Sequence, residues 1–115
     1  MRRGNHRKFA RERNQRKALY KALATALIEH GKVKTTVAKA KSLSQYTDKL
    51  VTKAKRGDLA TRRQVRQNLG EKATHKLFSD IGPKFKERSG GYTKVLRLGR
   101  RVSDGAEMAR IEFIQ

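Results

Sequence analysis

The 115-residue sequence contains no cysteine and no tryptophan, and its three tyrosines and four phenylalanines are its only aromatic residues. Without cysteine, disulfide bonds, thiolate catalysis and cysteine-ligated zinc sites are excluded, and a reducing compartment is favoured. No segment approaches the roughly 18 apolar residues that a membrane-spanning helix needs. Without tryptophan to anchor an interface, a protein that lies on a membrane surface is also disfavoured.

Acidic residues are scarce as well. Ten Asp and Glu stand against thirty Lys and Arg, which gives a formal net charge of +20. That much self-repulsion destabilises a compact state unless an anionic partner neutralises it, and clustered Lys and Arg are typical of nucleic-acid binding. The apolar residues are nevertheless grouped and periodic, which predicts a single folded domain that spans residues 1–115 and has a modest core.

The few titratable residues do not form a catalytic site or a metal site. Most acidic residues lie beside Lys or Arg, as in Glu87-Arg88, and nothing in the sequence pairs two carboxylates in a dry pocket. His6, His30 and His75 have no second ligand at a useful spacing. The phosphate-binding GxxxxGK[ST] pattern is absent. We therefore expect no enzymatic activity, no cofactor, no metal and no small-molecule substrate.

The N-terminus is the most basic part of the chain. Residues 1–17 carry eight Lys or Arg, one acid and a single large apolar residue, Phe9. Such a segment cannot bury a core by itself. Residues 1–14 are therefore predicted to form an arm that is largely unstructured in isolation and becomes ordered when it binds the phosphates of a nucleic acid. A solvated tail is the alternative.

Ala22-Leu23-Ala24 resembles the cleavage site of a signal peptide. Lysines interrupt the apolar run before it, so we expect a mature, cytosolic chain.

Residues 15–91 read as mainly helical. Leu19, Leu23 and Leu27, widened by Ala22, Ala26 and Ile28, form an apolar stripe that predicts a helix over 15–30, ended by Gly31. KVKTTV suits a short strand near 32–36 with Val33, Thr35 and Val37 on one face. Thr36 is expected to cap a helix that runs to about Arg56. Its predicted buried residues are Ala40, Leu43, Leu50, Val51 and Ala54.

Two further helices are expected. Gly57 and Asp58 predict the end of one helix and the cap of a short basic helix, whose Arg62, Arg63 and Arg66 share one side. A last helix is predicted from about Glu71, with Gly82-Pro83 as a firm stop. Its expected inward residues are Ala73, Leu77, Phe78 and Ile81.

The remainder, residues 92–115, has the two-residue period of a β-hairpin. Tyr92–Gly99 and Met108–Ile114 read as strands joined by a loop that contains Asp104-Gly105. In the second strand, Ala109, Ile111 and Phe113 are predicted on one face and Met108, Arg110 and Glu112 on the other. The alternation of the first strand is irregular. Helices packed on a small sheet with a C-terminal hairpin and a basic arm make an α+β fold.

The sequence RSGGYTKVLRLG raises a specific question, because two adjacent glycines precede a strand among many cations. A turn that feeds the strand would explain them without any function. The surrounding cations favour a second interpretation, in which the bare backbone lies against a sugar-phosphate chain and Tyr92 stacks on a base or sugar. These cations are Lys84, Lys86, Arg88, Lys94, Arg97, Arg100 and Arg101.

Four motifs in a fixed order resemble a known family. MRRGNHRKFAR, LIEHGKVKTTVAKAK, LFSDIGPKF and RSGGYTKVLRLG together are similar to the bacterial large-subunit ribosomal protein seventeen family, over essentially the whole chain. The resemblance implies an α+β domain that binds large-subunit ribosomal RNA near the exit of the nascent-peptide tunnel and supports subunit assembly and translation. It also implies neighbouring large-subunit proteins as partners and no catalysis. We expect one copy per ribosome and a monomer when free.

The predicted RNA-binding residues fall into three groups. The arm and the start of the first helix contribute charged residues, the KTT motif contributes two, and the glycine motif with its strand contributes the rest. They are Arg2, Arg3, His6, Arg7, Lys8, Arg11, Arg13 and Arg16; Lys34 and Thr35; and Arg88, Gly90, Gly91, Tyr92, Lys94, Arg97 and Arg100. The main alternative is a nucleoid-type or regulatory DNA-binding protein, with Arg62, Arg63 and Arg66 on a recognition helix.

Overall fold

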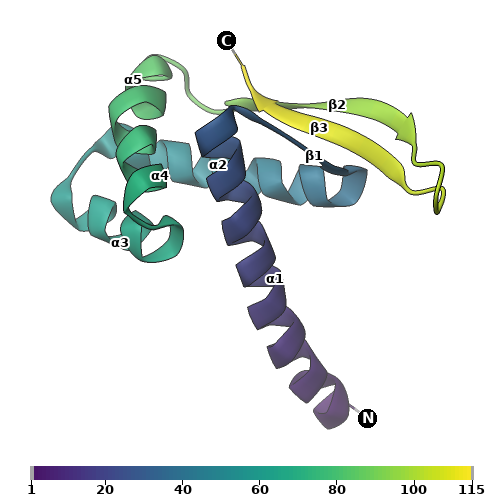
Figure 1. The fold of residues 1–115 in the computed structure, drawn as a ribbon. Helices are drawn as coiled ribbons and strands as arrows, with labels where there is room; N and C mark the ends of the chain where they lie inside the picture. The colour runs from purple at the N-terminus through teal and green to yellow at the C-terminus, as the bar shows by residue number, and fades with distance from the viewer. Residues whose placement is uncertain (1, 115) are drawn as a thin grey trace.

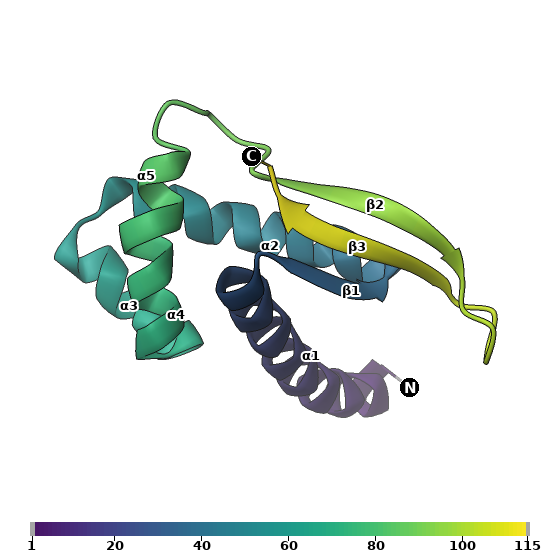
Figure 2. The same cartoon turned by 45° about the horizontal axis from the view of Figure 1, so that its top comes forward.

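The computed structural model describes the backbone of residues 2–114 and the side chains of residues 14–114. Its longest helix, α1 (Arg2–His30), leads away from the rest of the molecule toward its N-terminus in both views (Figures 1 and 2). The helix is continuous through the segment predicted as an irregular arm and begins at Arg2, well before the expected start at Gln15. The helix contacts α2, α3 and α4, and among its described side chains the fully buried ones, Ala24, Leu27 and Ile28, lie near its C-terminus.

The buried stripe of α1 is rotated relative to the prediction. Ala24, Leu27 and Ile28 are fully buried, and Leu23 packs on the core, whereas Leu19 and Ala22 are exposed. The four-residue spacing of the leucines identified the helix correctly but placed its apolar face on the side that carries Leu19. Leu19 is exposed because it lies on another side of α1 than the adjacent Tyr20, which packs against Tyr46 of α2.

The short strand and the long helix that follow agree closely with the sequence prediction. Gly31 has φ +82° and donates its N–H to the Leu27 carbonyl, which ends α1 and starts β1 (Lys32–Thr36). The Thr36 side chain accepts the Lys39 N–H and caps α2 (Val37–Arg56). Val37 is the first residue of this helix rather than the last of the strand. The five predicted core positions of α2 are all buried.

The turn to α3 (Leu59–Leu69) is also as predicted. Gly57 has φ +69° at the end of α2, and the Asp58 carboxylate accepts the Thr61 N–H at 2.8 Å at the start of α3. Helix α4 (Glu71–Lys76) follows, and its expected inward residues Ala73, Leu77 and Ile81 are buried, with Phe78 half-buried.

Gly82-Pro83 does not stop the chain's helical path, and this prediction was wrong. A π-helical turn, η1 (Leu77–Ile81), is followed directly by α5 (Gly82–Lys84). Proline inside an α-helix clashes with the carbonyl four residues earlier and lacks an N–H for it. The π-turn widens the ladder, so that the Gly82 N–H bonds to the Leu77 carbonyl and Pro83 fits without a break.

Three antiparallel strands make the sheet, in the order β1-β3-β2, with β2 (Thr93–Arg100) and β3 (Glu107–Phe113) forming the predicted hairpin. Val33, Ile111 and Val95 lie side by side in the register and pack toward the core. Helix α2 contacts both β2 and β3 and covers one face of the sheet, while the hairpin extends beyond the helices (Figure 2). The α+β prediction is therefore confirmed.

A bulge explains the irregular alternation in the first hairpin strand. Arg97 pairs with Ala109 and Gly99 pairs with Met108, which leaves Leu98 as an extra residue between them. A bulge of this kind shifts the side-chain alternation and increases the local twist. Ala109, Ile111 and Phe113 are buried as predicted, but Met108 on the other face is also buried, at 8% exposure.

Candidate nucleic-acid interface

The two glycines of the RSGGY motif form a loop that connects α5 to the sheet. Gly90 has φ +117° and Gly91 has φ +62°, conformations that side-chain-bearing residues rarely adopt. Arg88 folds back onto this loop, because its Nε donates to the carbonyls of Gly90 (3.2 Å) and Gly91 (3.0 Å). An added Cβ at Gly90 would meet no atom within 4 Å. The glycines therefore set the backbone path and leave its surface bare.

Two residues of α2, Asp48 and Lys55, fasten the loop at both ends. The Lys55 ammonium group donates to the Arg88 carbonyl and to the Tyr92 hydroxyl, the latter at 3.0 Å. The Asp48 carboxylate accepts the Tyr92 N–H and the Thr93 hydroxyl, each at 3.3 Å. These residues lie seven positions apart and hence on one side of the helix. We call Asp48 and Lys55 the α2 clamp.

The pKa values of Tyr92 and Asp48 both depart from their usual values. The hydrogen bond from Lys55 lowers the pKa of the Tyr92 phenol. Burial raises the pKa of the Asp48 carboxyl, although the hydrogen bonds from Tyr92 and Thr93 oppose that shift.

Tyr92 has a core role in place of the stacking role predicted for it. Its side chain is 2% exposed, and its ring packs against Phe85 with centroids 5.3 Å apart. The Lys55 Nζ lies 5.1 Å from the centroid of the same ring. No face of the ring is free for a base or sugar in this conformation, so Tyr92 contributes by fixing the glycine loop.

A groove of about 430 Å³ separates the glycine loop from α2. Gly90 and Gly91 line one side, and Lys49, Lys53 and Arg56 of α2 line the other. Sequence reasoning missed these three cations. Their spacing of three to four residues along one helix was the available signal. Backbone without side chains opposite a row of cations is an arrangement that suits a phosphate chain.

The outward face of the sheet forms a second basic surface. The register places Lys32, Glu112 and Lys94 in one row and Lys34, Arg110 and Leu96 in the next. Glu112 is the one acid in these two rows, and it pairs with Lys94 and with Arg110, each at 3.3 Å. Lys34, a predicted RNA contact, is exposed on this surface. Thr35, the other predicted contact of this strand, lies on the opposite face, in register with Ala109 and Arg97.

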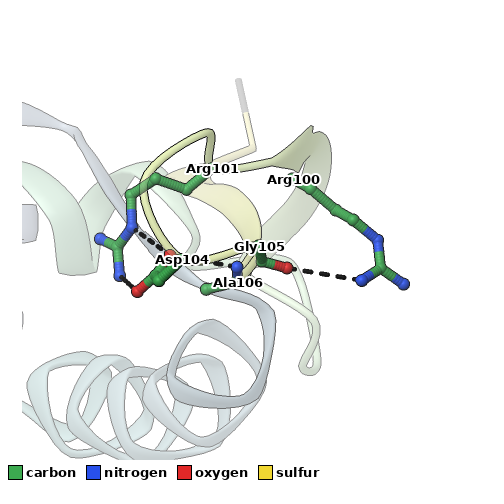
Figure 3. A network of polar contacts seen from close by, with 5 residues as sticks. All are labelled: Arg100, Arg101, Asp104, Gly105 and Ala106. Atoms are coloured by element: carbon green, nitrogen blue, oxygen red, sulfur yellow. Dashed lines mark hydrogen bonds and ion pairs between the residues drawn. The ribbon is translucent and has the colours of Figure 1, made fainter.

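The tip of the hairpin carries three arginines in a fixed arrangement. The Arg101 guanidinium binds both oxygens of Asp104, at 2.9 and 2.7 Å, and Asp104 also accepts the Ala106 N–H (Figure 3). These contacts lower the pKa of Asp104 to about 2. Arg97 and Arg100 share Glu107 at 4.0 and 3.7 Å and stay mostly exposed. Both remain accessible to an anion.

Helix α1 contributes the remaining predicted residues. Arg16 is exposed. The predicted contacts at Arg2, Arg3, His6, Arg7, Lys8, Arg11 and Arg13 involve side chains outside the described residues. Of the alternative recognition helix, Arg62 lies over the Phe78 ring at 5.5 Å, while Arg63 and Arg66 are exposed.

The cations of the helices differ from those of the hairpin in their partners. All ion pairs among the described side chains lie between residues 94 and 112, within the β2–β3 hairpin. Among the side chains of residues 14–114, no Lys or Arg on α1 to α5 has a carboxylate within 4.0 Å. The described part of the chain includes no group of three His, Asp or Glu that could hold a metal ion. It also contains no helix that is long and apolar enough to cross a membrane.

Comparison with known proteins finds relatives over nearly the whole chain. Residues 19–114 match the family model described as ribosomal protein L17. A protein of Natranaerobius thermophilus named large ribosomal subunit protein bL17 is 48% identical over 112 residues, which covers 96% of this chain and 99% of that protein.

Proteins of the same name from two other bacteria are equally similar. The protein of Gemmatimonas aurantiaca is 49% identical over 110 residues, covering 95% of this chain and 93% of its own. That of Persephonella marina is 51% identical over 110 residues, covering 93% and 89%. This chain, a basic α+β domain that aligns over at least 93% of its length with these proteins at about half identity, belongs to the ribosomal protein L17 family.

Proposed function

We propose that this protein is a structural constituent of the large ribosomal subunit, and that it binds large-subunit ribosomal RNA near the exit of the nascent-peptide tunnel. In this role it supports subunit assembly and translation in the cytoplasm, as one copy per ribosome and without catalysis. The relatives bear the name large ribosomal subunit protein, which supports the assignment to that subunit. Neighbouring large-subunit proteins complete its surroundings, and the free chain is a monomer.

The observation that carries the RNA-binding proposal is the lack of acidic partners for the helical cations. Lys49, Lys53 and Arg56 face the bare backbone of Gly90 and Gly91 across the groove. Asp48 also lines this groove, but its carboxylate accepts hydrogen bonds from Tyr92 and Thr93 and makes no ion pair with the three cations. Three cations beside one carboxylate repel one another in the free protein, and phosphates relieve that cost when the protein binds. The loop backbone can approach a sugar-phosphate chain closely, because no side chain projects from the two glycines.

RNA is read here through its shape. The major groove of an A-form helix is too narrow for side chains to read, so phosphates, 2′-hydroxyls and the backbone path provide the recognition. Arginine binds phosphate through paired donors, and lysine acts as a looser point charge. Affinity should fall steeply with salt, with a log–log slope of roughly −0.7 to −0.9 for each phosphate neutralised.

Sedimentation of the native protein tests the proposal. A cell lysate is separated on sucrose gradients at low and at moderate salt, and the fractions are probed for this chain. We expect co-migration with the large subunit at both salt concentrations. Sedimentation with the nucleoid would support the DNA-binding alternative instead, and material that stays near the top of both gradients would refute a ribosomal role.

A matched pair of variants tests the groove itself. Lys49→Gln/Lys53→Gln removes two charges from the groove, and Lys39→Gln/Lys41→Gln removes two exposed charges of the same helix outside the groove. The groove variant should enter large subunits less well when it competes with the unaltered protein. Equal losses in both variants would show that net charge, and not the groove, determines binding. Crosslinking within intact subunits then tests the position near the tunnel exit.

A further inference from the structure

A second groove, of about 400 Å³, is lined by residues of α1, α2 and α3. It is lined by Arg16, Lys17, Tyr20 and Lys21 of α1, Tyr46 of α2 and Asn68 of α3. None of these residues belongs to the glycine loop or to the outward face of the sheet. Apart from Arg16, none of them is among the residues predicted to bind RNA.

The floor of this groove is a pair of stacked tyrosines. The rings of Tyr20 and Tyr46 have centroids 6.3 Å apart and planes inclined by 27°. Both side chains are half-buried and pack against the core with part of their surface. Burial raises the pKa of Tyr46, so its phenol is neutral at physiological pH. Both rings line the groove, so part of their aromatic surface is open to solvent.

The rim of the groove is basic, and none of the described residues that line it is acidic. Arg16, Lys17 and Lys21 have no carboxylate within 4.0 Å among the described side chains. Asn68 is exposed, and its side-chain amide can both donate and accept hydrogen bonds. An occupant that suits this groove must combine a flat π surface with negative charge and polar edges.

We propose that this groove, here called the tyrosine groove, binds one unstacked nucleotide of single-stranded RNA. The base stacks on the Tyr20–Tyr46 pair, its flanking phosphates lie on Arg16, Lys17 and Lys21, and Asn68 contacts the base edge. Aromatic side chains beside cations are how proteins hold bases from RNA loops and bulges. The inference rests on the proposed RNA-binding function and adds a defined site and ligand class to it.

Intrinsic fluorescence of the full-length protein tests this proposal directly. The chain has no tryptophan and only three tyrosines, of which Tyr92 is buried and cannot touch a base, so quenching by a stacked base reports on Tyr20 and Tyr46. The protein is titrated with short oligoadenylate and, as a control for charge alone, with inorganic polyphosphate. We expect quenching by oligoadenylate at saturation and none by polyphosphate. Equal quenching by both, or by neither, would overturn the stacking site.

Two variants separate stacking from structure. Tyr20→Leu/Tyr46→Leu keeps apolar bulk and should weaken oligoadenylate binding by at least roughly five-fold, the lower end for one base on an aromatic ring. Tyr20→Phe/Tyr46→Phe keeps the rings and should bind like the unaltered protein. Unchanged affinity in the leucine variant refutes the site.

Ultraviolet crosslinking of the unaltered protein to oligoadenylate provides a test that does not depend on the folding of a variant. Crosslinked peptides should contain Tyr20 or Tyr46, and their absence overturns the proposal. Binding to large-subunit ribosomal RNA is measured in parallel. If that binding persists while the tyrosine tests fail, only the tyrosine groove is refuted. If the unaltered protein prefers duplex DNA to ribosomal RNA, the proposed function fails as well.

Discussion

Replacing Gly82 with alanine should destabilise the protein, although alanine is the better helix former. Gly82 is helical, with φ −56° and ψ −52°, and lies where α5 crosses α2. A Cβ built on it would lie 3.2 Å from the Ala54 Cβ and 3.3 Å from the carbonyl carbon and oxygen of Ala54. Two of these three atoms belong to the backbone of α2, which cannot give way without moving the helix.

The expected sign of the stability change follows from comparing three contributions to the free energy of unfolding. Alanine gains about 1 kcal/mol over glycine in a helix interior. Overpacking a tight contact costs about 1–3 kcal/mol. Alanine before Pro83 adds a further cost, since proline disfavours a helical conformation in a preceding residue that has a Cβ. We therefore expect a net loss of roughly 1–2 kcal/mol in the free energy of unfolding, which lowers Tm by several degrees in a domain of this size.

Urea unfolding monitored by circular dichroism measures this loss. The double variant Gly82→Ala/Pro83→Ala is the control, because it removes the proline clash and keeps the contact with Ala54. The stability lost by Gly82→Ala in the Pro83→Ala background should be smaller than in the unaltered protein, but it should not vanish. If Gly82→Ala instead stabilises the protein by about 1 kcal/mol, the propensity gain of alanine is fully realised and the reasoning about the close helix contact is refuted.

Three further predictions concern the interface. Lys55→Met keeps the aliphatic packing of the clamp but removes its donors, so amides of residues 88–93 should exchange with solvent faster while those of α3 do not; uniform acceleration would argue against a local role. Gly91→Ala places a side chain at φ +62° and should cost about 1–2 kcal/mol of stability and weaken RNA binding; unchanged affinity in a folded variant would exclude the loop from the interface. The pKa of Asp104 is about 2 in the folded protein, below its usual 3.8, so the stabilisation it shares with Arg101 is complete above about pH 4 and is lost as pH falls through 2. An NMR titration of the Asp104 carboxyl should show this low midpoint, and an ordinary midpoint would mean that the ion pair does not persist in solution.

The helical part of the fold was largely predictable because its signals are local. The Thr36 and Asp58 caps and the ends at Gly31 and Gly57 depend on side chains and φ values within a few residues. The prediction failed at Gly82-Pro83, where a π-turn admits proline by widening a hydrogen-bond ladder. It also failed for the buried face of α1, because the neighbouring helices, and not the periodicity of α1 itself, decide which side of that helix is covered.

The candidate site was only partly predictable. The exposure of Lys34, Lys94, Arg97 and Arg100 agrees with their proposed role, and the glycines adopt the positive φ values that justify glycine there. The stacking role predicted for Tyr92 does not fit its buried position. The sequence pattern of an aromatic residue beside a basic motif is the same whether its ring faces RNA or the core. The groove cations of α2 were missed because the loop opposite them is more than thirty residues away in the sequence.

Composition and local pattern by themselves determined that this chain is a basic α+β domain without cysteine chemistry, and they placed most helix and strand boundaries. They did so because net charge, capping and hydrophobic period are properties of single residues and short segments. Only the tertiary structure decided which cations share a surface. The pairing of β1 with β3, the α2 clamp and the meeting of Tyr20 with Tyr46 each join residues distant in the chain, and long-range packing alone brings such residues together.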